Sequence, residues 1–235
     1  MELHCGKPVI VEFNGLPGTG KTTTACQLKQ MLNDRGIECT DIFFYGKSFK
    51  KSRYANWISP SCWRLRNLLN DYIRTFDPSV DKYSRNDKFL QFFREYREFN
   101  KFRCGVLLKD QGLIQMLLSI AHLDKIGDTY QIEQIAEFLD KRISFLRVDC
   151  AINPIISSHR IIKRKPSGSR LEKITSKDLT DAMNLQADNL EIIRSSFDKL
   201  SLKNIQVIHL DTKESVEKNA EILLRKILTM RNINA

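Results

Sequence analysis

A glycine-rich segment that ends in lysine and threonine carries the clearest chemistry in this 235-residue chain. It reads Gly15-Leu-Pro-Gly-Thr-Gly-Lys-Thr22, which fits the spacing G-x-x-x-x-G-K-[ST] of a phosphate-binding loop. Glycines let successive backbone N–H groups turn toward phosphate oxygens, Lys21 adds a positive charge between the β- and γ-phosphates, and the Thr22 hydroxyl is a ligand for Mg²⁺. The residues expected to hold the nucleotide are Gly15, Pro17, Gly18, Thr19, Gly20, Lys21, Thr22 and Thr23.

An acidic residue at the end of another apolar run supplies the second half of such a site. Asp110 follows the run Val106-Leu-Leu-Lys109 and precedes Gly112, which would let the chain approach phosphates closely. An aspartate in this place either helps to hold Mg²⁺ or caps the helix that is expected to begin near Gln111. Beside a phosphate loop we favour the magnesium role, with Thr22 and Asp110 as the metal residues.

A basic segment over residues 160–173 has the composition of a lid that closes over a phosphoryl group in transfer. Arg160, Arg164 and Arg170 are the candidates to stabilise the migrating charge, alongside Lys21 and Asp110 as catalytic residues. Two other interpretations remain for this segment, which are a nucleic-acid-binding loop and a stretch of solvent-exposed charge.

Short apolar runs alternate with segments of helical periodicity along the chain, which predicts an α/β domain with a parallel sheet. The expected strands are 8–13, 41–45, 105–108, 143–148 and 205–210. The expected helices are 22–34, 61–76, 84–102, 111–123, 129–139, 178–200 and 214–228. We expect one domain over residues 1–235, with a helical region on the acceptor side over about 47–103 and the lid over about 160–173.

Composition narrows the classes of function. The net charge of +10 suits either nucleic acid or a site that handles several phosphates. No apolar run approaches the ~18 residues needed to cross a bilayer, and no basic and apolar leader is found at the N-terminus. The six cysteines are scattered without a Cys-x-x-Cys pair, so we expect reduced cysteines, no zinc site and a cytoplasmic protein.

The order of these motifs resembles that of the P-loop nucleoside and nucleotide kinases, and among them the thymidylate-kinase-like group. The segments that carry the resemblance are the loop 15–22, the strand end at Asp110, the stretch 145–149 leading to Arg160, Arg164 and Arg170, and the run 207–211 before a last helix. The resemblance implies a P-loop NTPase fold with a five-stranded parallel sheet in the order 2-3-1-4-5 and helices on both faces. It also implies that Arg94 or Arg97 grips the phosphoacceptor.

Two departures from the thymidylate kinases bear on the acceptor. This chain has Asp110-Gln-Gly112 where those enzymes usually carry Asp-Arg-Tyr, and it has the basic stretch 47–53 where they tend to place an acidic residue. A basic acceptor face suits an anionic acceptor better than a plain nucleoside.

The sequence therefore predicts a phosphotransferase that uses ATP and Mg²⁺ to phosphorylate a small acceptor, a nucleotide or another anionic metabolite. The alternatives are a polynucleotide end-kinase, which the positive charge permits but which we do not favour, and an ATP-binding switch or scaffold without acceptor chemistry. We expect no membrane partner, and a homodimer is compatible with the sequence. The guanine-binding motif Asn-Lys-x-Asp is absent, which argues against a GTPase.

Overall fold

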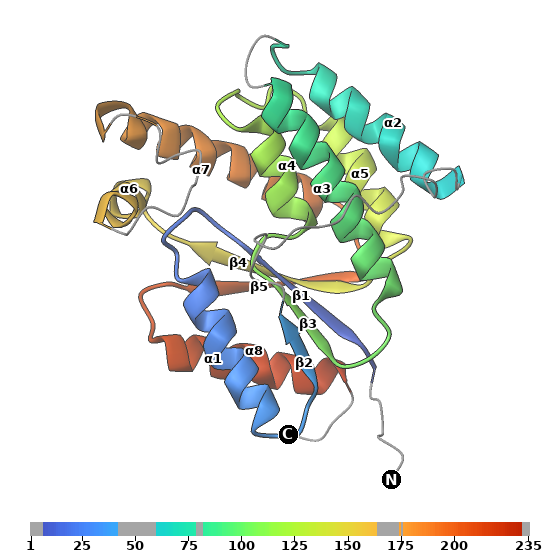
Figure 1. The fold of residues 1–235 in the computed structure, drawn as a ribbon, viewed down its shortest axis with the longest axis vertical. Helices are drawn as coiled ribbons and strands as arrows, with labels where there is room; N and C mark the ends of the chain where they lie inside the picture. The colour runs from blue at the N-terminus through green and yellow to red at the C-terminus, as the bar shows by residue number, and fades with distance from the viewer. Residues whose placement is uncertain (1–6, 42–59, 79–81, 164–173, 175, 232–235) are drawn as a thin grey trace.

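A five-stranded parallel sheet in the order β2-β3-β1-β4-β5 forms the centre of the protein (Figure 1). The computed structural model describes residues 7–41, 60–78, 82–163, 174 and 176–231. The strands are β1 (Val9–Asn14), β2 (Cys39–Asp41), β3 (Val106–Lys109), β4 (Phe145–Ala151) and β5 (Ile205–Asp211). The expected fold, strand order and parallel pairing are confirmed.

Helices cover both faces of the sheet. They are α1 (Lys21–Asn33), α2 (Pro60–Arg74), α3 (Lys82–Lys101), α4 (Leu113–Ala121), α5 (Tyr130–Asp140), α6 (Pro154–Lys163), α7 (Ser176–Asp198) and α8 (Val216–Met230). In Figure 1, α1 and α8 lie against one face, whereas α2, α3, α4, α5 and α7 cover the other. All residues of β1 and β3 are buried, which explains why these strands are almost continuously apolar in sequence.

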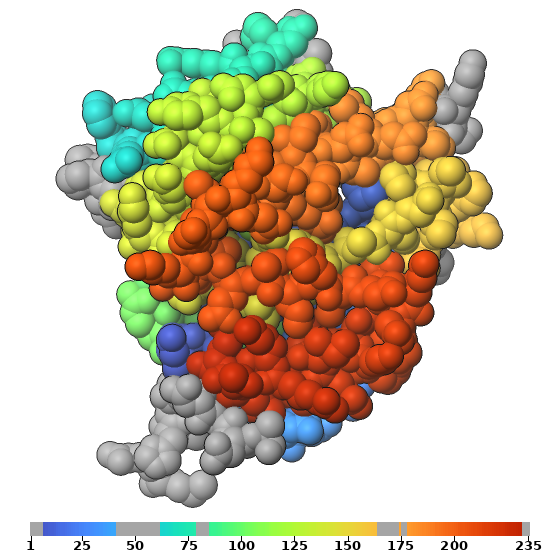
Figure 2. Space-filling model, turned by 180° about the vertical axis from the view of Figure 1, so that it is seen from behind, coloured from blue at the N-terminus to red at the C-terminus, as the bar shows by residue number. Residues whose placement is uncertain are grey.

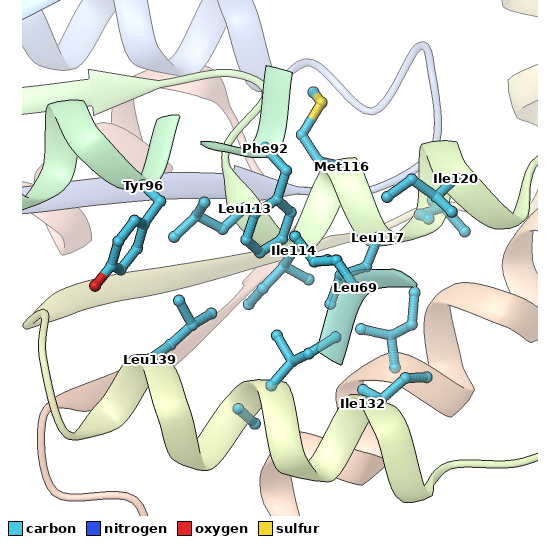
Figure 3. Close-up of a cluster of buried hydrophobic side chains, with 14 of the residues drawn as sticks. Leu69, Phe92, Tyr96, Leu113, Ile114, Met116, Leu117, Ile120, Ile132 and Leu139 are labelled. Carbon is cyan, nitrogen blue, oxygen red and sulfur yellow. The ribbon is translucent and has the colours of Figure 1, made fainter. Parts of the chain in front are cut away.

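The larger of the two main cores fills the space between the sheet and the helices α2 to α5 and α7. Figure 3 shows Leu69 of α2, Phe92 of α3 and Leu117 of α4 converging with Ile132 of α5. The smaller core joins α1 and α8 to the opposite face of the sheet. Both cores anchor the strands of the sheet. Ligands of open α/β sheets bind at the carboxyl ends of the strands, so the cores also fix the edge that carries the predicted site.

Several expected boundaries differ from those of the structure. The second strand is Cys39–Asp41, and the remainder of the expected run 41–45 lies outside the described residues. The start of the acceptor-side region, residues 47–59, also lies outside them. The expected lid begins inside a helix, because residues 160–163 form the last turn of α6, while residues 164–173 lie outside the described part of the chain.

One prediction about the cysteines is wrong. Cys104 is disulfide-bonded, whereas Cys26 and Cys150 are free thiols. A cytoplasmic location stays a prediction, and this disulfide bond weighs against it, because disulfide bonds persist mainly in oxidising compartments. Among the described residues, no helix is both long and apolar enough to span a membrane.

Candidate phosphate-binding site

The loop between β1 and α1 adopts a conformation that depends on glycine. Gly18 has φ 81° and Gly20, the N-cap residue of α1, has φ 86°, and both values lie in the left-handed region that side chains disfavour. Gly15 is needed for a different reason, which is space. A Cβ at this position would lie 2.5 Å from the carbonyl oxygen of Cys150 in β4. The strand β4 therefore fixes where the loop begins, and α1 presents its N-terminus to the loop.

The Lys21 ammonium lies on the loop itself. It donates hydrogen bonds to the carbonyl oxygens of Gly15 at 2.8 Å and Leu16 at 2.9 Å and to the hydroxyl of Thr19 at 3.2 Å. These acceptors are neutral, and a phosphate oxygen is a stronger acceptor for an ammonium group. The geometry thus keeps the cation of the loop close to where a phosphate group would be bound.

The two predicted magnesium residues are in direct contact although they are 88 positions apart in sequence. The Thr22 hydroxyl donates a 2.7 Å hydrogen bond to Oδ2 of Asp110, which follows β3. The other carboxylate oxygen of Asp110, Oδ1, is buried and accepts no hydrogen bond. A hydroxyl and an aspartate are oxygen ligands of the kind that Mg²⁺ takes, and an oxygen without a hydrogen bond leaves a coordination position for the ion. The residues present therefore fit a magnesium ion.

Asp110 does not cap the helix that follows it, and this disfavours the alternative interpretation of its role. The N-cap residue of α4 is Gly112, with no capping side chain of its own. Instead Oε1 of Glu12, in the middle of β1, accepts hydrogen bonds from the backbone N–H groups of Ile114 at 2.7 Å and Gln115 at 3.2 Å. A buried carboxyl group thus ties β1 to the start of α4.

Glu12 is fully buried, and its role could not be recognised from the sequence. Desolvation raises the pKa of its carboxyl group from 4.5 to about 8, against the hydrogen bonds from α4 that lower the pKa. A Cβ on Gly112 would lie 2.3 Å from the Glu12 carboxyl carbon, so glycine is needed there for space. The available signal was a glutamate in the middle of the apolar run Val9–Phe13.

Gln115 extends this connection to the phosphate loop. Its side-chain oxygen accepts a 3.3 Å hydrogen bond from the backbone N–H of Gly15, while its own backbone N–H donates to Glu12. The first glycine of the loop and the segment that carries Asp110 are therefore held by the same turn of α4.

The helix α6 contacts the phosphate loop on another side. Arg160 donates a 2.6 Å hydrogen bond to the carbonyl oxygen of Gly18, and the Ser157 hydroxyl donates to that of Pro17. A Cβ on Gly18 would lie 3.1 Å from Cβ of Arg160. The structure therefore brings Arg160 to the loop, while Arg164 and Arg170 lie outside the described residues.

Comparisons with known proteins add likenesses of fold. No family model and no curated protein matches the chain. Among solved structures, the YorR protein from Bacillus subtilis in complex with phosphorylated GDP is similar with TM-score 0.49 and 14% identity, covering 97% of this chain and 100% of that chain. Deoxyadenosine kinase from M. mycoides with bound dATP has TM-score 0.47 and 14% identity, covering 93% and 98%. Shikimate kinase from Acinetobacter baumannii in complex with shikimate has TM-score 0.46 and 14% identity, covering 95% and 94%.

The strand order and the loop between β1 and α1 together define a P-loop NTPase fold. The thymidylate-kinase-like subgroup stays a prediction, because no family model matches the chain.

The two arginines expected to grip an acceptor lie on α3, apart from the phosphate loop in sequence and element. Arg97 is exposed and Arg94 is partly buried. Near them, the buried ammonium of Lys109 pairs with Glu95 at 2.7 Å and also with Glu98. This ion-pair cluster connects α3 to the end of β3, immediately before Asp110.

Proposed function

We propose that the chain is a P-loop phosphotransferase that uses ATP and Mg²⁺ to phosphorylate a small anionic acceptor. The observation that carries this proposal is the contact between Thr22 and Asp110, with a buried oxygen of Asp110 that accepts no hydrogen bond. An ATP-binding site needs both a phosphate cradle and an acidic residue for the metal, and this contact supports a site that combines them.

Catalysis at such a site consists of positioning and charge stabilisation. Thr22 and Asp110 would hold Mg²⁺, which would supply positive charge to the bound phosphates. The loop amides and Lys21 bind the phosphates, and the N-terminus of α1 favours their negative charge. Arg160 lies at the rim of the loop and, with Arg164 and Arg170, is our candidate to stabilise the group in transfer.

Charge supports an anionic acceptor. The chain carries a net charge of +10, with basic stretches at 47–53 and 160–173, and cationic surfaces raise the local concentration of anionic substrates. We therefore place a nucleotide or another anionic metabolite ahead of an uncharged nucleoside. Arg94 and Arg97 are the candidates on α3 to bind it.

The test is ATP consumption with Mg²⁺ against a panel of nucleosides, nucleotides, acidic metabolites and oligonucleotides. We expect turnover that depends on one anionic class of acceptor, and that is abolished in Lys21→Ala. Asp110→Asn should raise the Mg²⁺ concentration required for half-maximal turnover by about tenfold, because it removes one charge from a metal ligand. Lys226→Ala in α8 is a control for the loss of a lysine elsewhere.

The outcomes separate the alternatives. Phosphate transferred to an oligonucleotide, with binding that weakens steeply as salt rises, would favour a polynucleotide end-kinase. ATP binding that no acceptor converts into turnover would contradict the phosphotransferase and leave a switch or scaffold.

A further inference from the structure

An arginine of α7 lies beneath the start of the phosphate loop. Arg194 donates through one terminal nitrogen, Nη2, to the carbonyl oxygens of Asn14 at 3.1 Å and Cys150 at 3.4 Å. Asn14 is the last residue of β1 and Cys150 lies near the end of β4. The side chain of Arg194 is only 12% exposed, so Arg194 joins the two strand ends from inside the protein.

The two carbonyl groups that Arg194 binds lie beside Gly15, the glycine of the loop with the least space for a side chain. Gly15 directly follows Asn14, and a Cβ on Gly15 would lie 2.5 Å from the carbonyl oxygen of Cys150. A shift of either strand end would therefore move the first residue of the loop. Arg194 contacts both of these strand ends through hydrogen bonds.

A buried acidic residue fixes Arg194 in place. Asp149 is 2% exposed, and its Oδ1 lies 3.3 Å from Nε of Arg194, close enough for an ion pair but not aligned as a hydrogen bond. The opposite oxygen, Oδ2, is held by Arg147 at 2.9 Å, and Arg147 also binds Asp198 at the end of α7 at 2.7 Å. Asp149 thus has partners on two sides and is not free to turn away from Arg194.

The same helix also contacts the loop through apolar side chains. Leu16 is buried in a small cluster with Ile161 of α6 and Leu179 and Met183 of α7. Figure 2 shows atoms of the first, blue part of the chain in the hollow between α6 and α7. α7 therefore supports both ends of the segment 14–16, Asn14 through a hydrogen bond and Leu16 through packing.

We propose that Arg194 is a positioning residue of the phosphate loop, which sets the loop amides for a nucleotide by binding the strand ends on either side of Gly15. This inference rests on the proposed binding of a nucleotide by the loop. It assigns Arg194 no contact with the substrate. Arg194 acts through the backbone of Asn14 and Cys150.

A purely structural role for Arg194 makes a different prediction. If Arg194 served only to neutralise the buried Asp149, any cation in its place would restore all properties of the protein. Lysine retains the charge, but its compact ammonium lacks the fork of donors that reaches a carboxylate and two carbonyl groups together. The positioning role therefore predicts that Arg194→Lys restores stability without restoring nucleotide affinity.

The experiment compares Arg194→Met and Arg194→Lys with the wild-type chain, and uses Arg225→Met as the matched control because Arg225 of α8 is 79% exposed. Affinity for the β,γ-imido analogue of ATP with Mg²⁺ is measured by calorimetry well below each melting temperature. We expect Arg194→Met to bind about tenfold or more weakly, as loss of a charge-assisted hydrogen bond implies. Arg194→Lys should have a melting temperature near that of the wild type and still bind the analogue about tenfold more weakly. Arg225→Met should bind the analogue with wild-type affinity.

Hydrogen exchange of the nucleotide-free protein gives a second measurement that needs no ligand. The amides of residues 15, 16 and 18–20 should exchange faster in both Arg194 variants, while peptides from α8 keep the wild-type rate. Equal affinity of Arg194→Met and wild type, full recovery of affinity in Arg194→Lys, or unchanged exchange of the loop would each overturn the proposal. Absence of nucleotide binding by the wild type would instead refute the proposed function, and the exchange measurement would still decide the role of Arg194.

Discussion

Replacing Glu12 with glutamine should remove a pH dependence from the free energy of unfolding. The carboxyl group is fully buried, and desolvation raises its pKa from 4.5 to about 8. The unfolded chain releases this proton near pH 4.5, whereas the native protein keeps it until about pH 8. Between these values the native state binds more protons, so its stability is greatest below pH 4.5 and is lost as the pH rises toward 8.

The size of the effect follows from the two pKa values. Between about pH 5.5 and about pH 7.5, the proton on Glu12 accounts for a loss of about 2.5 kcal/mol of stability in the wild type. The glutamine side chain of the Glu12→Gln variant would still offer an oxygen to the backbone N–H groups of Ile114 and Gln115, and it cannot ionise. Its NH₂ group takes the place of a buried oxygen that accepts no hydrogen bond, which changes stability by a similar amount at every pH.

The assay is urea denaturation of the wild type and Glu12→Gln across this pH range. The free energy of the variant minus that of the wild type should rise by about 2.5 kcal/mol from the lower to the higher pH. Glu221→Gln, at an exposed position of α8, controls for the removal of a carboxylate and should show a constant difference. A constant difference for Glu12→Gln as well, within about 0.5 kcal/mol, would refute the reasoning that a buried carboxyl group holds a proton here.

Three further predictions concern packing and access. Gly112→Ala should lower the free energy of unfolding in urea by about 2 kcal/mol, because the new Cβ would lie 2.3 Å from the buried carboxyl carbon of Glu12. Gly127→Ala should leave the free energy of unfolding unchanged, because a Cβ there would have nothing within 4 Å. Equal effects of the two variants would contradict the packing argument. Lys109→Met should lower the free energy of unfolding by about 3 kcal/mol, because it removes a buried cation from the carboxylates of Glu95 and Glu98. An unchanged melting temperature would show that these ion pairs do not contribute to stability. Iodoacetamide should label the exposed Cys26 and spare Cys150, because burial raises the pKa of the Cys150 thiol to about 11. If mass spectrometry found both cysteines labelled in the native protein, β4 would have to open.

The phosphate loop could be predicted because its chemistry is local. Its glycines, lysine and threonine occupy fixed positions in eight consecutive residues, so the motif can be read from one short segment of the sequence. Asp110 could be predicted for a different reason. Parallel strands present their carboxyl ends at one edge, so an acidic residue after β3 lies beside a loop after β1.

The supports of the loop could not be predicted in the same way. Glu12, Gln115 and Arg194 act through backbone groups about one hundred or more residues away, and backbone groups leave no trace in the sequence. Arg160, the first residue of the expected lid, lies in the last turn of α6 and donates to Gly18, and the apolar periodicity of the sequence did not predict this helix from Pro154. The bonded state of Cys104 was missed because spacing does not reveal which cysteines meet.

The distances in sequence between the loop and its supports have a consequence for how the site is made. Asn14 and Arg194 are 180 positions apart, and Pro17 and Ser157 are 140 apart. Contacts between residues so far apart form late in folding, because closing a long loop loses chain entropy before the new contact contributes any favourable free energy. A ribosome adds residues 15–22 before α7 (Ser176–Asp198), so Arg194 can bind the loop only after α7 has been synthesised. We therefore expect that the nascent chain acquires full nucleotide affinity only after α7 has been synthesised and has left the ribosome.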